Sequence, residues 1–307
     1  MTEMQKSVSL TLLRFAAMLI VTWAVLVGAA MGAGRALPGG GVIAFDCGGD
    51  IHLLDVSRGY ERSLTDKIET GLYSFSPAWS PDGERIAFIV GTDYEFLGGR
   101  IYVMDMNGGN VRQISNVAYA FNTLSWSPDS THIAFGPGTR VDGNIYVIDV
   151  ESGYITQVNR EPVQADWLMW SPTRSEIAFV SWNSENGTIF TIASDRNNIQ
   201  QITHNISYIF RPAWSPDGNQ IAFSAGSEIL HEIYVINRDG SNLRQLTNNN
   251  MSNLNPTWSP DGQQIAFEFG QFYGDNPQIY TMNADGTNLR QLTHVFCARP
   301  LVPVWRP

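Results

Sequence analysis

Six tryptophans recur along this 307-residue chain at nearly constant intervals, and this repeat constrains the fold more than any other sequence feature. Their spacings are 47, 44, 44, 44 and 47 residues, at positions Trp79, Trp126, Trp170, Trp214, Trp258 and Trp305. The first five begin related phrases, which read WSPDGERIAF, WSPDSTHIAF, WSPTRSEIAF, WSPDGNQIAF and WSPDGQQIAF. A period of about 40–50 residues with several short strands is typical of a β-propeller blade.

Each repeat divides into four short strands, which we name A to D in chain order. Strand A ends at the tryptophan, and a Ser-Pro-Asp-Gly turn leads into strand B, which contains Ile-Ala-Phe. A second phrase such as IYVMDMNGGNVRQIS supplies strand C, a polar turn and strand D. A helical solenoid would instead show a period of about 3.6 residues. The sequence therefore predicts an all-β fold of four-stranded antiparallel blades.

The two ends of the repeat region complete one another. Residues 41–45 read as a strand B without a strand A before it, whereas residues 302–307 read as a strand A with nothing after it. We therefore expect Val304 and Trp305 to pair with residues 43–45, so that one split blade contains both ends. Five whole blades and this split blade predict a six-bladed β-propeller over residues 41–307, closed so that its strand edges are protected.

The first 34 residues form a separate segment, which we expect to be an apolar helix. Lys6 and Arg14 precede an almost uncharged apolar run, which ends in small residues between Gly28 and Gly34. This order is typical of a secretory signal peptide, but a run of about 20 residues is also long enough for a retained membrane anchor. Both alternatives place the remainder outside the cytoplasm: in the periplasm, on the cell surface or secreted. We expect residues 35–40 to be a linker.

The repeat phrases carry a family resemblance. WSPDG, IAF, IYV and NLRQLT are similar to the repeats of TolB, the periplasmic propeller of the Tol–Pal envelope system, and residues 41–307 resemble the TolB-like (PD40, WD40-like) propeller family. Related repeats occur in the propeller domains of prolyl-oligopeptidase-like peptidases. The resemblance implies a six-bladed propeller that acts as an interaction module. We expect the α/β domain that precedes the propeller in TolB to be absent here, because Pro38 follows the apolar segment almost directly.

The composition and motifs exclude several function classes. With 19 basic and 29 acidic residues the net charge is −10, and no basic cluster follows Arg14, so we expect no nucleic-acid partner. The sequence has no nucleophile elbow, HExxH motif or P-loop, which favours a non-catalytic protein without a cofactor. A single Asp in each turn, one blade apart, cannot converge on one metal ion, so we expect these residues to be structural. The turn residues assigned to the structural repeat are Asp82, Gly83, Asp217, Gly218, Asp261 and Gly262.

The histidines and cysteines allow further expectations. His204 and His294 share one repeat position two blades apart, and we expect the five histidines to be solvent-facing loop residues rather than zinc ligands. Cys47 ends strand B of the split blade, and Cys297 lies just before strand A of the same blade. In an oxidising compartment these two cysteines can form a disulfide that joins the chain ends; the alternative is two separate thiols.

Strand direction sorts the connections onto two faces. The A–B and C–D turns share one face, which we call the turn face, and the B–C and D–A connections share the other, the loop face. The loop face has longer and more varied connections, and it collects aromatic side chains and carboxylates that are typical of recognition surfaces. The candidate partner-binding residues are Tyr94, Phe96, Tyr119, Trp167, Trp182, Tyr208, Phe272, Tyr273, Asp93, Asp142, Asp166 and Glu228.

These observations predict an exported, non-catalytic, monomeric propeller that binds a protein or peptide partner in the cell envelope. It would contact the membrane only through the possible N-terminal anchor. A carbohydrate stacked on the loop-face rings stays open as a partner. Two other functions also stay open. One is a glycan hydrolase or lyase with carboxylates at the channel mouth, which would need two carboxyls about 5–10 Å apart. The other is a mainly structural surface protein.

Overall fold

The computed structural model describes most of the repeat region. The described residues are 41–65, 72–92, 99–116, 123–136, 143–182, 187–193, 198–227, 229–270, 277–294 and 302–307. These residues form 24 strands and contain no helix. Within this part of the chain there is accordingly no helix long and apolar enough to cross a membrane. The predicted signal or anchor segment at residues 1–34 and the linker at 35–40 lie outside the described residues.

The first whole blade, blade 1, shows how the repeat phrase folds. Its strands are β4 (Tyr73–Trp79), β5 (Arg85–Gly91), β6 (Arg100–Asp105) and β7 (Arg112–Gln113), hydrogen-bonded in that order. Between β4 and β5, the Gly83 N–H donates to the Ser80 carbonyl at 2.8 Å, which closes a tight turn. Gly83 has a φ of 69°, a conformation that glycine adopts without steric cost. The Ser-Pro-Asp-Gly phrase therefore forms the A–B hairpin as predicted.

Blades 2 to 5 repeat this arrangement, four strands to a sheet. Their strands are β8 (Leu124–Trp126), β9 (His132–Phe135), β10 (Tyr146–Asp149), β11 (Ile155–Gln157), β12 (Ala165–Trp170), β13 (Glu176–Ser181), β14 (Thr188–Ala193), β15 (Ile199–Gln201), β16 (Phe210–Trp214), β17 (Gln220–Gly226), β18 (His231–Asn237), β19 (Arg244–Gln245), β20 (Ser252–Trp258), β21 (Gln264–Gly270), β22 (Gln278–Asn283) and β23 (Arg290–Gln291). All strand pairs within them are antiparallel.

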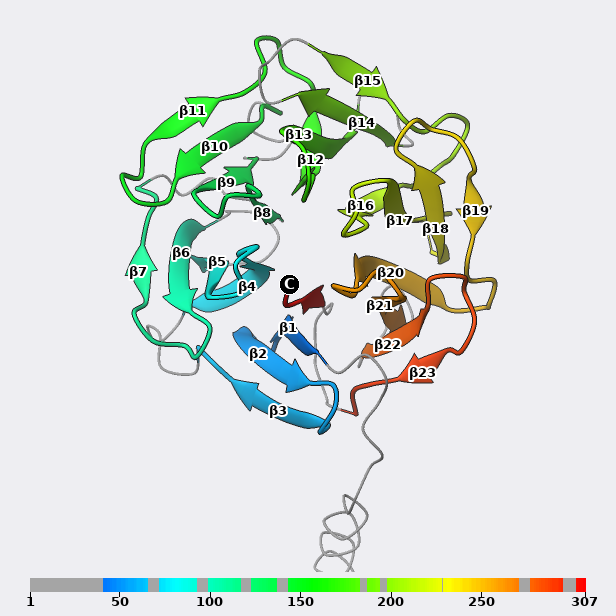
Figure 1. Cartoon of the computed structure of the whole chain (residues 1–307), viewed down its shortest axis with the longest axis horizontal. Coiled ribbons are helices and arrows are strands. Elements are labelled where there is room, and N and C mark those ends of the chain that lie inside the picture. The colour runs from blue at the N-terminus through cyan, green and yellow to red at the C-terminus, as the bar shows by residue number, and fades with distance from the viewer. Residues whose placement is uncertain are drawn as a thin grey trace, which may run out of the picture. The chain divides into compact units, whose positions relative to one another are not determined.

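The sixth sheet is the predicted split blade. Strand β24 (Val304–Trp305), from the C-terminal end, pairs with β1 (Val42–Cys47), which is followed by β2 (Asp50–Asp55) and β3 (Tyr60–Ser63). Trp305 lies opposite Ile43 and Val304 opposite Ala44. The predicted closure and the predicted number of six blades are confirmed. Figure 1 shows the ring, with β24 and β1 side by side near its centre.

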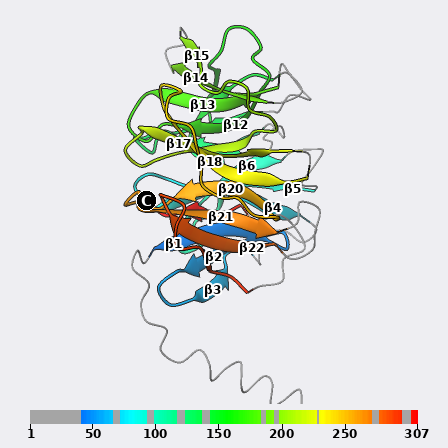
Figure 2. The ribbon, with the colours of Figure 1, turned by 90° about the vertical axis from the view of Figure 1, so that its right-hand side faces the viewer.

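The core lies between neighbouring blades. The Phe of each Ile-Ala-Phe phrase is almost completely buried, as in Phe88, Phe179 and Phe223. The apolar clusters each combine residues of two adjacent blades, for example Trp79 with Ala44, and Trp258 with Ala222. Burying one such aromatic side chain contributes about 1.5–3 kcal/mol, so the blades are stabilised mainly by contact with their neighbours. Figure 2 shows the ring edge-on, with the two ends of each strand on opposite sides.

The repeat tryptophans are packing residues. All except Trp170 have a relative exposure of at most 7%. At three blade boundaries the indole N–H donates to a backbone carbonyl of the preceding blade; for example, Trp214 Nε1 lies 3.1 Å from the Met169 oxygen and Trp258 Nε1 lies 3.2 Å from the Ala213 oxygen. The indole nitrogens of Trp79, Trp170 and Trp305 are buried without a hydrogen-bond partner in the described structure. The repeat tryptophan therefore adds an indole hydrogen bond at some blade boundaries and not at others.

Candidate binding sites on the propeller

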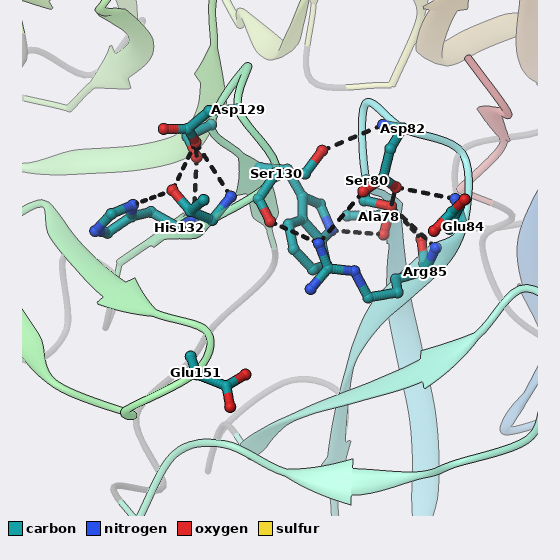
Figure 3. A network of polar contacts seen from close by, with 12 residues as sticks. Ala78, Ser80, Asp82, Glu84, Arg85, Asp129, Ser130, His132 and Glu151 are labelled. Carbon is teal, nitrogen blue, oxygen red and sulfur yellow. Dashed lines mark hydrogen bonds and ion pairs between the residues drawn. The ribbon is translucent and has the colours of Figure 1, made fainter.

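The A–B turns link adjacent blades on the turn face through their own polar groups. In blade 1 the Asp82 carboxylate accepts from the Ser80 hydroxyl and from the Glu84 N–H, at 2.5 and 3.0 Å. Arg85 lies 3.3 Å from Asp82 and donates to the Ser130 carbonyl of blade 2 at 2.7 Å. Figure 3 shows Arg85 reaching from its own turn toward the next one. These contacts give Asp82 and Arg85 a structural role.

The turn carboxylates are nevertheless charged. Hydrogen bonds from the Ser127 and Thr131 hydroxyls hold the pKa of Asp129 down to about 2. A serine hydroxyl in the same turn is also the main cause of the lowered pKa of Asp217 and of Asp261. The pKa of Asp82 is lowered too: burial acts against this, but the hydrogen bonds outweigh it. Four turns therefore carry a full negative charge on this face at neutral pH.

A channel lies between the six innermost strands. Its volume is about 1100 Å³, including the part open to solvent, and every strand A contributes to its wall. The wall is mostly apolar: besides the six tryptophans it includes Pro77, Pro81, Pro172, Pro212, Pro216, Pro256, Pro303 and Pro307. Pro81 and Pro216 belong to the A–B turns, so the channel mouth lies on the turn face beside the charged Asp82 and Asp217. The space in it that water-sized molecules can reach is about 220 Å³, below the usual range for small-ligand pockets.

Four of the innermost strands share an irregularity three residues before the tryptophan. The register with strand B shifts there in β4, β12, β16 and β20. The residues at this position have φ between 40° and 54°, which is unusual for any residue except glycine: they are Ser76, Trp167, Arg211 and Asn255. A β-bulge of this kind re-aims a side chain. Three of the four side chains line the channel, and one of these is Arg211.

Among the described residues of the channel wall, Arg211 is the only cationic one. Burial lowers the pKa of its guanidinium, and the charges of Asp46, Asp166 and Glu268 act in the opposite direction. Within the described part of the chain the guanidinium makes no hydrogen bond and no ion pair. Arg211 lines the channel, and among the described residues none accepts a hydrogen bond from its guanidinium, which stays protonated in proteins.

The carboxylates near Arg211 are held by other groups. Asp46 is buried, which raises its pKa, while the charge of Arg211 and two backbone hydrogen bonds oppose that rise. These bonds come from the N–H groups of Ser76 and Val302, at 3.3 and 3.0 Å. Glu268 is also buried and accepts a 2.7 Å hydrogen bond from the Asn255 side chain. Asp46 and Glu268 therefore already have partners from neighbouring strands.

An aromatic cluster lies on the loop face where blades 3 and 4 meet. The rings of Trp167 and Phe210 are 4.8 Å apart, and those of Trp167 and Trp182 are 5.5 Å apart. His231 packs edge-on against Phe210 at 4.8 Å. Trp167, Trp182 and Phe210 are half-buried, so part of each ring faces solvent. This cluster contains two of the predicted partner-binding residues.

Exposed apolar residues adjoin the cluster. Ile229 and Leu230 lie at the tip of the hairpin between β17 and β18, with 61% and 42% of their surface exposed. The hairpin is fixed to the preceding D–A connection because the Gly226 N–H donates to the Ser207 carbonyl at 3.1 Å. His231, one residue after the tip, is the ring that packs on Phe210. The tip therefore directly precedes a residue of the aromatic cluster in the chain, and we call the set Trp167, Trp182, Phe210, Ile229 and Leu230 the blade 3–4 patch.

The structure places some predicted site residues and not others. Trp167, Trp182, Asp166 and Tyr208 are half-buried on blades 3 and 4. Tyr208, with a φ of 52°, lies in the D–A connection of blade 4. The other candidates lie outside the described residues: Asp93, Tyr94, Phe96, Tyr119, Asp142, Glu228, Phe272 and Tyr273. For these the assignment to a binding surface stays a prediction.

The expectation that all five histidines are solvent-facing loop residues is wrong, because His52, His132 and His231 lie on strands β2, β9 and β18. His231 is fully buried, and this burial lowers its pKa to about 4, so the imidazole is neutral at physiological pH. The reason for the burial of His231 is that it is the first residue of strand β18 and not a loop residue. Its ring points under the hairpin toward Phe210 and the Ser252 hydroxyl. His204 and His294 are exposed as predicted, each 3.2 Å from a glutamine three residues earlier.

Cys47, at the loop-face end of β1, is disulfide-bonded. Cys297, the other cysteine of the sequence, lies outside the described residues. The pairing of these two residues across the split blade stays a prediction.

The sequence analysis missed Arg211, Asp46 and Glu268. An internal alignment would have revealed them. Asp46 and Glu268 follow Ile-Ala-Phe, a place where other blades have Ile89 or Val180. Arg211 stands three residues before its tryptophan, a place that is otherwise small or uncharged. A charged residue at one copy of an otherwise neutral repeat position is the signal that identifies such a site.

Comparison with known families agrees with this architecture. The TolB beta propeller domain family matches residues 68–208 and 168–300. The chain belongs to the TolB propeller family. TolB from Acinetobacter baumannii superposes with a TM-score of 0.74 at 18% identity, over 89% of this chain and 68% of the other. At that identity the likeness shows the shared fold alone.

Two further proteins resemble parts or all of this TolB-family propeller. The oligogalacturonate lyase of Vibrio parahaemolyticus superposes with a TM-score of 0.51 at 14% identity, over 83% of this chain and 74% of the other. In sequence, the "uncharacterized peptidase YuxL" of Bacillus subtilis is 36% identical over 73 residues. That match covers 22% of this chain and only 11% of the Bacillus protein.

Proposed function

We propose that this protein is an extracytoplasmic, non-catalytic interaction module whose propeller docks a protein or peptide partner on its loop face. The single observation that carries the proposal is the blade 3–4 patch, where half-buried aromatic rings adjoin an exposed aliphatic pair. Aromatic side chains at a partly exposed apolar surface are enriched at the energetic centres of protein interfaces. Isolated apolar residues elsewhere on the surface need no such explanation.

The location outside the cytoplasm is supported by the sequence and by the family. Two basic residues, an apolar run and a small-residue exit precede the propeller, which is the order found in export signals. Membership of the TolB family is consistent with this location. In an oxidising compartment a disulfide at Cys47 would also persist.

Site-specific photocrosslinking in intact cells tests the docking surface. A benzoyl-phenylalanine placed at Ile229 should form an adduct with one discrete protein, identified by mass spectrometry. The matched control is Ile199, which is 48% exposed on the outer strand β15, away from the patch. We expect the adduct from position 229 and not from 199, and we expect W182A to reduce its yield. Equal adducts from both positions, or none from 229, would contradict the proposal.

A second candidate function has one observation in its favour. The carboxylates Asp46, Asp166 and Glu268 lie close enough to the channel residue Arg211 to affect its pKa, and paired carboxyls can supply the general acid and base of glycan cleavage. The oligogalacturonate lyase with a similar fold makes that substrate class a specific choice. Incubation with oligogalacturonate, followed by chromatography of the products, tests it. Cleavage that R211M abolishes would establish the enzyme; unchanged oligosaccharide would exclude this substrate.

A further inference from the structure

We propose that the central channel is a second binding site, for an extended peptide segment whose uncharged apolar stretch enters from the turn face while a Lys or Arg stays at the rim. The channel and the blade 3–4 patch are built from different residues and open on different faces. The proposal therefore does not rest on the loop-face interaction, and each can fail without the other.

The wall of the channel selects the shape and polarity of the ligand. Prolines from several blades line it, together with Ala78, Met169 and Val304, so the surface is aliphatic and narrow. A sugar would need exposed ring faces for stacking. Five of the six tryptophans cannot supply these, since they are at most 7% exposed, and Trp79, for example, packs between two blades. Apolar side chains on an extended backbone fit such a wall better than a carbohydrate does.

Arg211 decides which group the inner end of the ligand must carry. Arg211 lines the channel, no described residue accepts a hydrogen bond from its guanidinium, and unpaired donors that lose their water are costly. A ligand that enters must therefore offer hydrogen-bond acceptors. The charges of Asp46, Asp166 and Glu268 already surround Arg211, so a further carboxylate would be repelled. Neutral acceptors, namely the backbone carbonyls of a peptide, satisfy the donors without this repulsion.

The rim selects the charge of the flanking residues. Asp82 and Asp217 follow directly on the mouth-lining residues Pro81 and Pro216. Asp129 and Asp261 occupy the same turn position in blades 2 and 5. Serine hydroxyls fix these four carboxylates in place, so they form a preorganised anionic rim. Asp82 is already paired with Arg85, so a basic side chain at the mouth gains mainly from Asp129, Asp217 and Asp261, whereas an acidic one is repelled.

Binding can be measured with two peptide pools on the purified full-length propeller. Both pools consist of acetylated, amidated peptides with a short random stretch of Ala, Leu, Pro and Val; one pool has Lys at both ends and the other has Glu. Retained peptides are identified by mass spectrometry, and their Kd is then measured by fluorescence polarisation. We expect retention from the Lys pool only, with an affinity that falls as salt is added. Retention from the Glu pool, or from neither pool, would overturn the proposal.

Variants then assign the binding to the channel. R211M keeps the aliphatic stem and removes the donors, so we expect the Kd of a retained peptide to rise roughly tenfold to a hundredfold. R58M is the matched control, because Arg58 is exposed on the split blade away from the channel. It should leave the Kd unchanged. A Kd that R211M does not alter, in a protein that melts at the wild-type temperature, would overturn the proposal.

A second variant pair tests the rim and guards against misfolding of R211M. D217N preserves the oxygen that accepts from Ser215 and removes one rim charge. We expect several-fold weaker binding of the Lys peptide at low salt and no difference at high salt. E151Q removes a carboxylate that is 96% exposed on an outer C–D turn and should have no effect. If D217N and E151Q weakened binding of the Lys peptide equally, the rim carboxylates would act only through the overall charge of the protein. This result would contradict the proposal.

Discussion

The two faces of the propeller are made by the same six repeats, yet they differ in how the repeats use their residues. On the turn face the sequence recurs almost unchanged, and Ser, Asp and Arg side chains are occupied by hydrogen bonds within and between turns. On the loop face the connections differ from blade to blade, and aromatic or aliphatic side chains gather at one boundary. Recurrence therefore marks residues that build the ring, and departure from the repeat marks residues free for recognition.

The largest expected effect is on the free energy of unfolding, and it distinguishes a residue of the core from a residue of the loop face. Phe223 is fully buried between blades, and F223A should lower the free energy of unfolding by about 3–5 kcal/mol because it leaves a cavity. Ile229 is exposed at the tip of the blade 3–4 patch, and I229A should change stability by less than about 0.5 kcal/mol. Urea unfolding followed by tryptophan fluorescence measures both. Equal losses would mean that the hairpin tip is part of the core.

The second-largest expected effect concerns the interactions that stabilise the split blade, one on each face. On the loop face Cys47 is disulfide-bonded, and removal of this bond should cost about 2–4 kcal/mol. On the turn face Arg306 donates to the Gly83 carbonyl at 3.0 Å, and R306M should cost about 1 kcal/mol. Thermal unfolding of C47S and R306M, with non-reducing mass spectrometry of the wild type, tests this order. Two free thiols in the exported protein would contradict the disulfide.

Much of this architecture could be predicted from the sequence, because each blade depends on local turns and on contacts with its neighbours. The strands, the Ser-Pro-Asp-Gly hairpins and the pairing of Trp305 with Ile43 all follow from the repeat. The channel site did not follow, because Arg211 and Asp46 are 165 residues apart (211 − 46) and meet only once the ring closes. The bulge that turns Arg211 toward the channel has no signal in a sequence pattern of period two.

The aromatic cluster on the loop face was also only partly predictable from the sequence. Trp167 and Trp182 could be named as candidates from the sequence, but their packing on Phe210 could not, because it joins strands of two blades. His231 was misplaced because a buried histidine at the start of a strand resembles a loop residue when only its polarity is considered.

A smaller effect distinguishes blade boundaries that look identical in sequence. The indole N–H of Trp214 donates to Met169, whereas that of Trp170 has no partner in the described structure. We expect W214F to cost about 1 kcal/mol more than W170F, because only the former loses a hydrogen bond. Guanidinium chloride midpoints of the two variants give the comparison. A larger loss for W170F would show that the indole hydrogen bond is not what fastens these boundaries.

The smallest expected effect concerns the turn carboxylates. The pKa of Asp129 is lowered to about 2 by the Ser127 and Thr131 hydroxyls, so its stabilisation is present above the ordinary pKa of 3.8 and is lost as the pH falls toward 2. Because Asp129 is exposed, we expect less than about 1 kcal/mol. D129N should lower stability by up to this amount near neutral pH, and its difference from the wild type should shrink as the pH falls toward 2. A loss that stays the same between neutral pH and pH 2 would contradict a charge effect.

The account rests on two separate recognition surfaces, and one crossed experiment tests this most directly. W182A and R211M are each assayed for the crosslink from position 229 and for the Kd of a Lys-flanked peptide, after equal melting temperatures have been confirmed. The account predicts that W182A reduces only the crosslink and that R211M weakens only the peptide. If either variant impaired both measurements, or if neither changed its own, the separation of the two faces would be wrong.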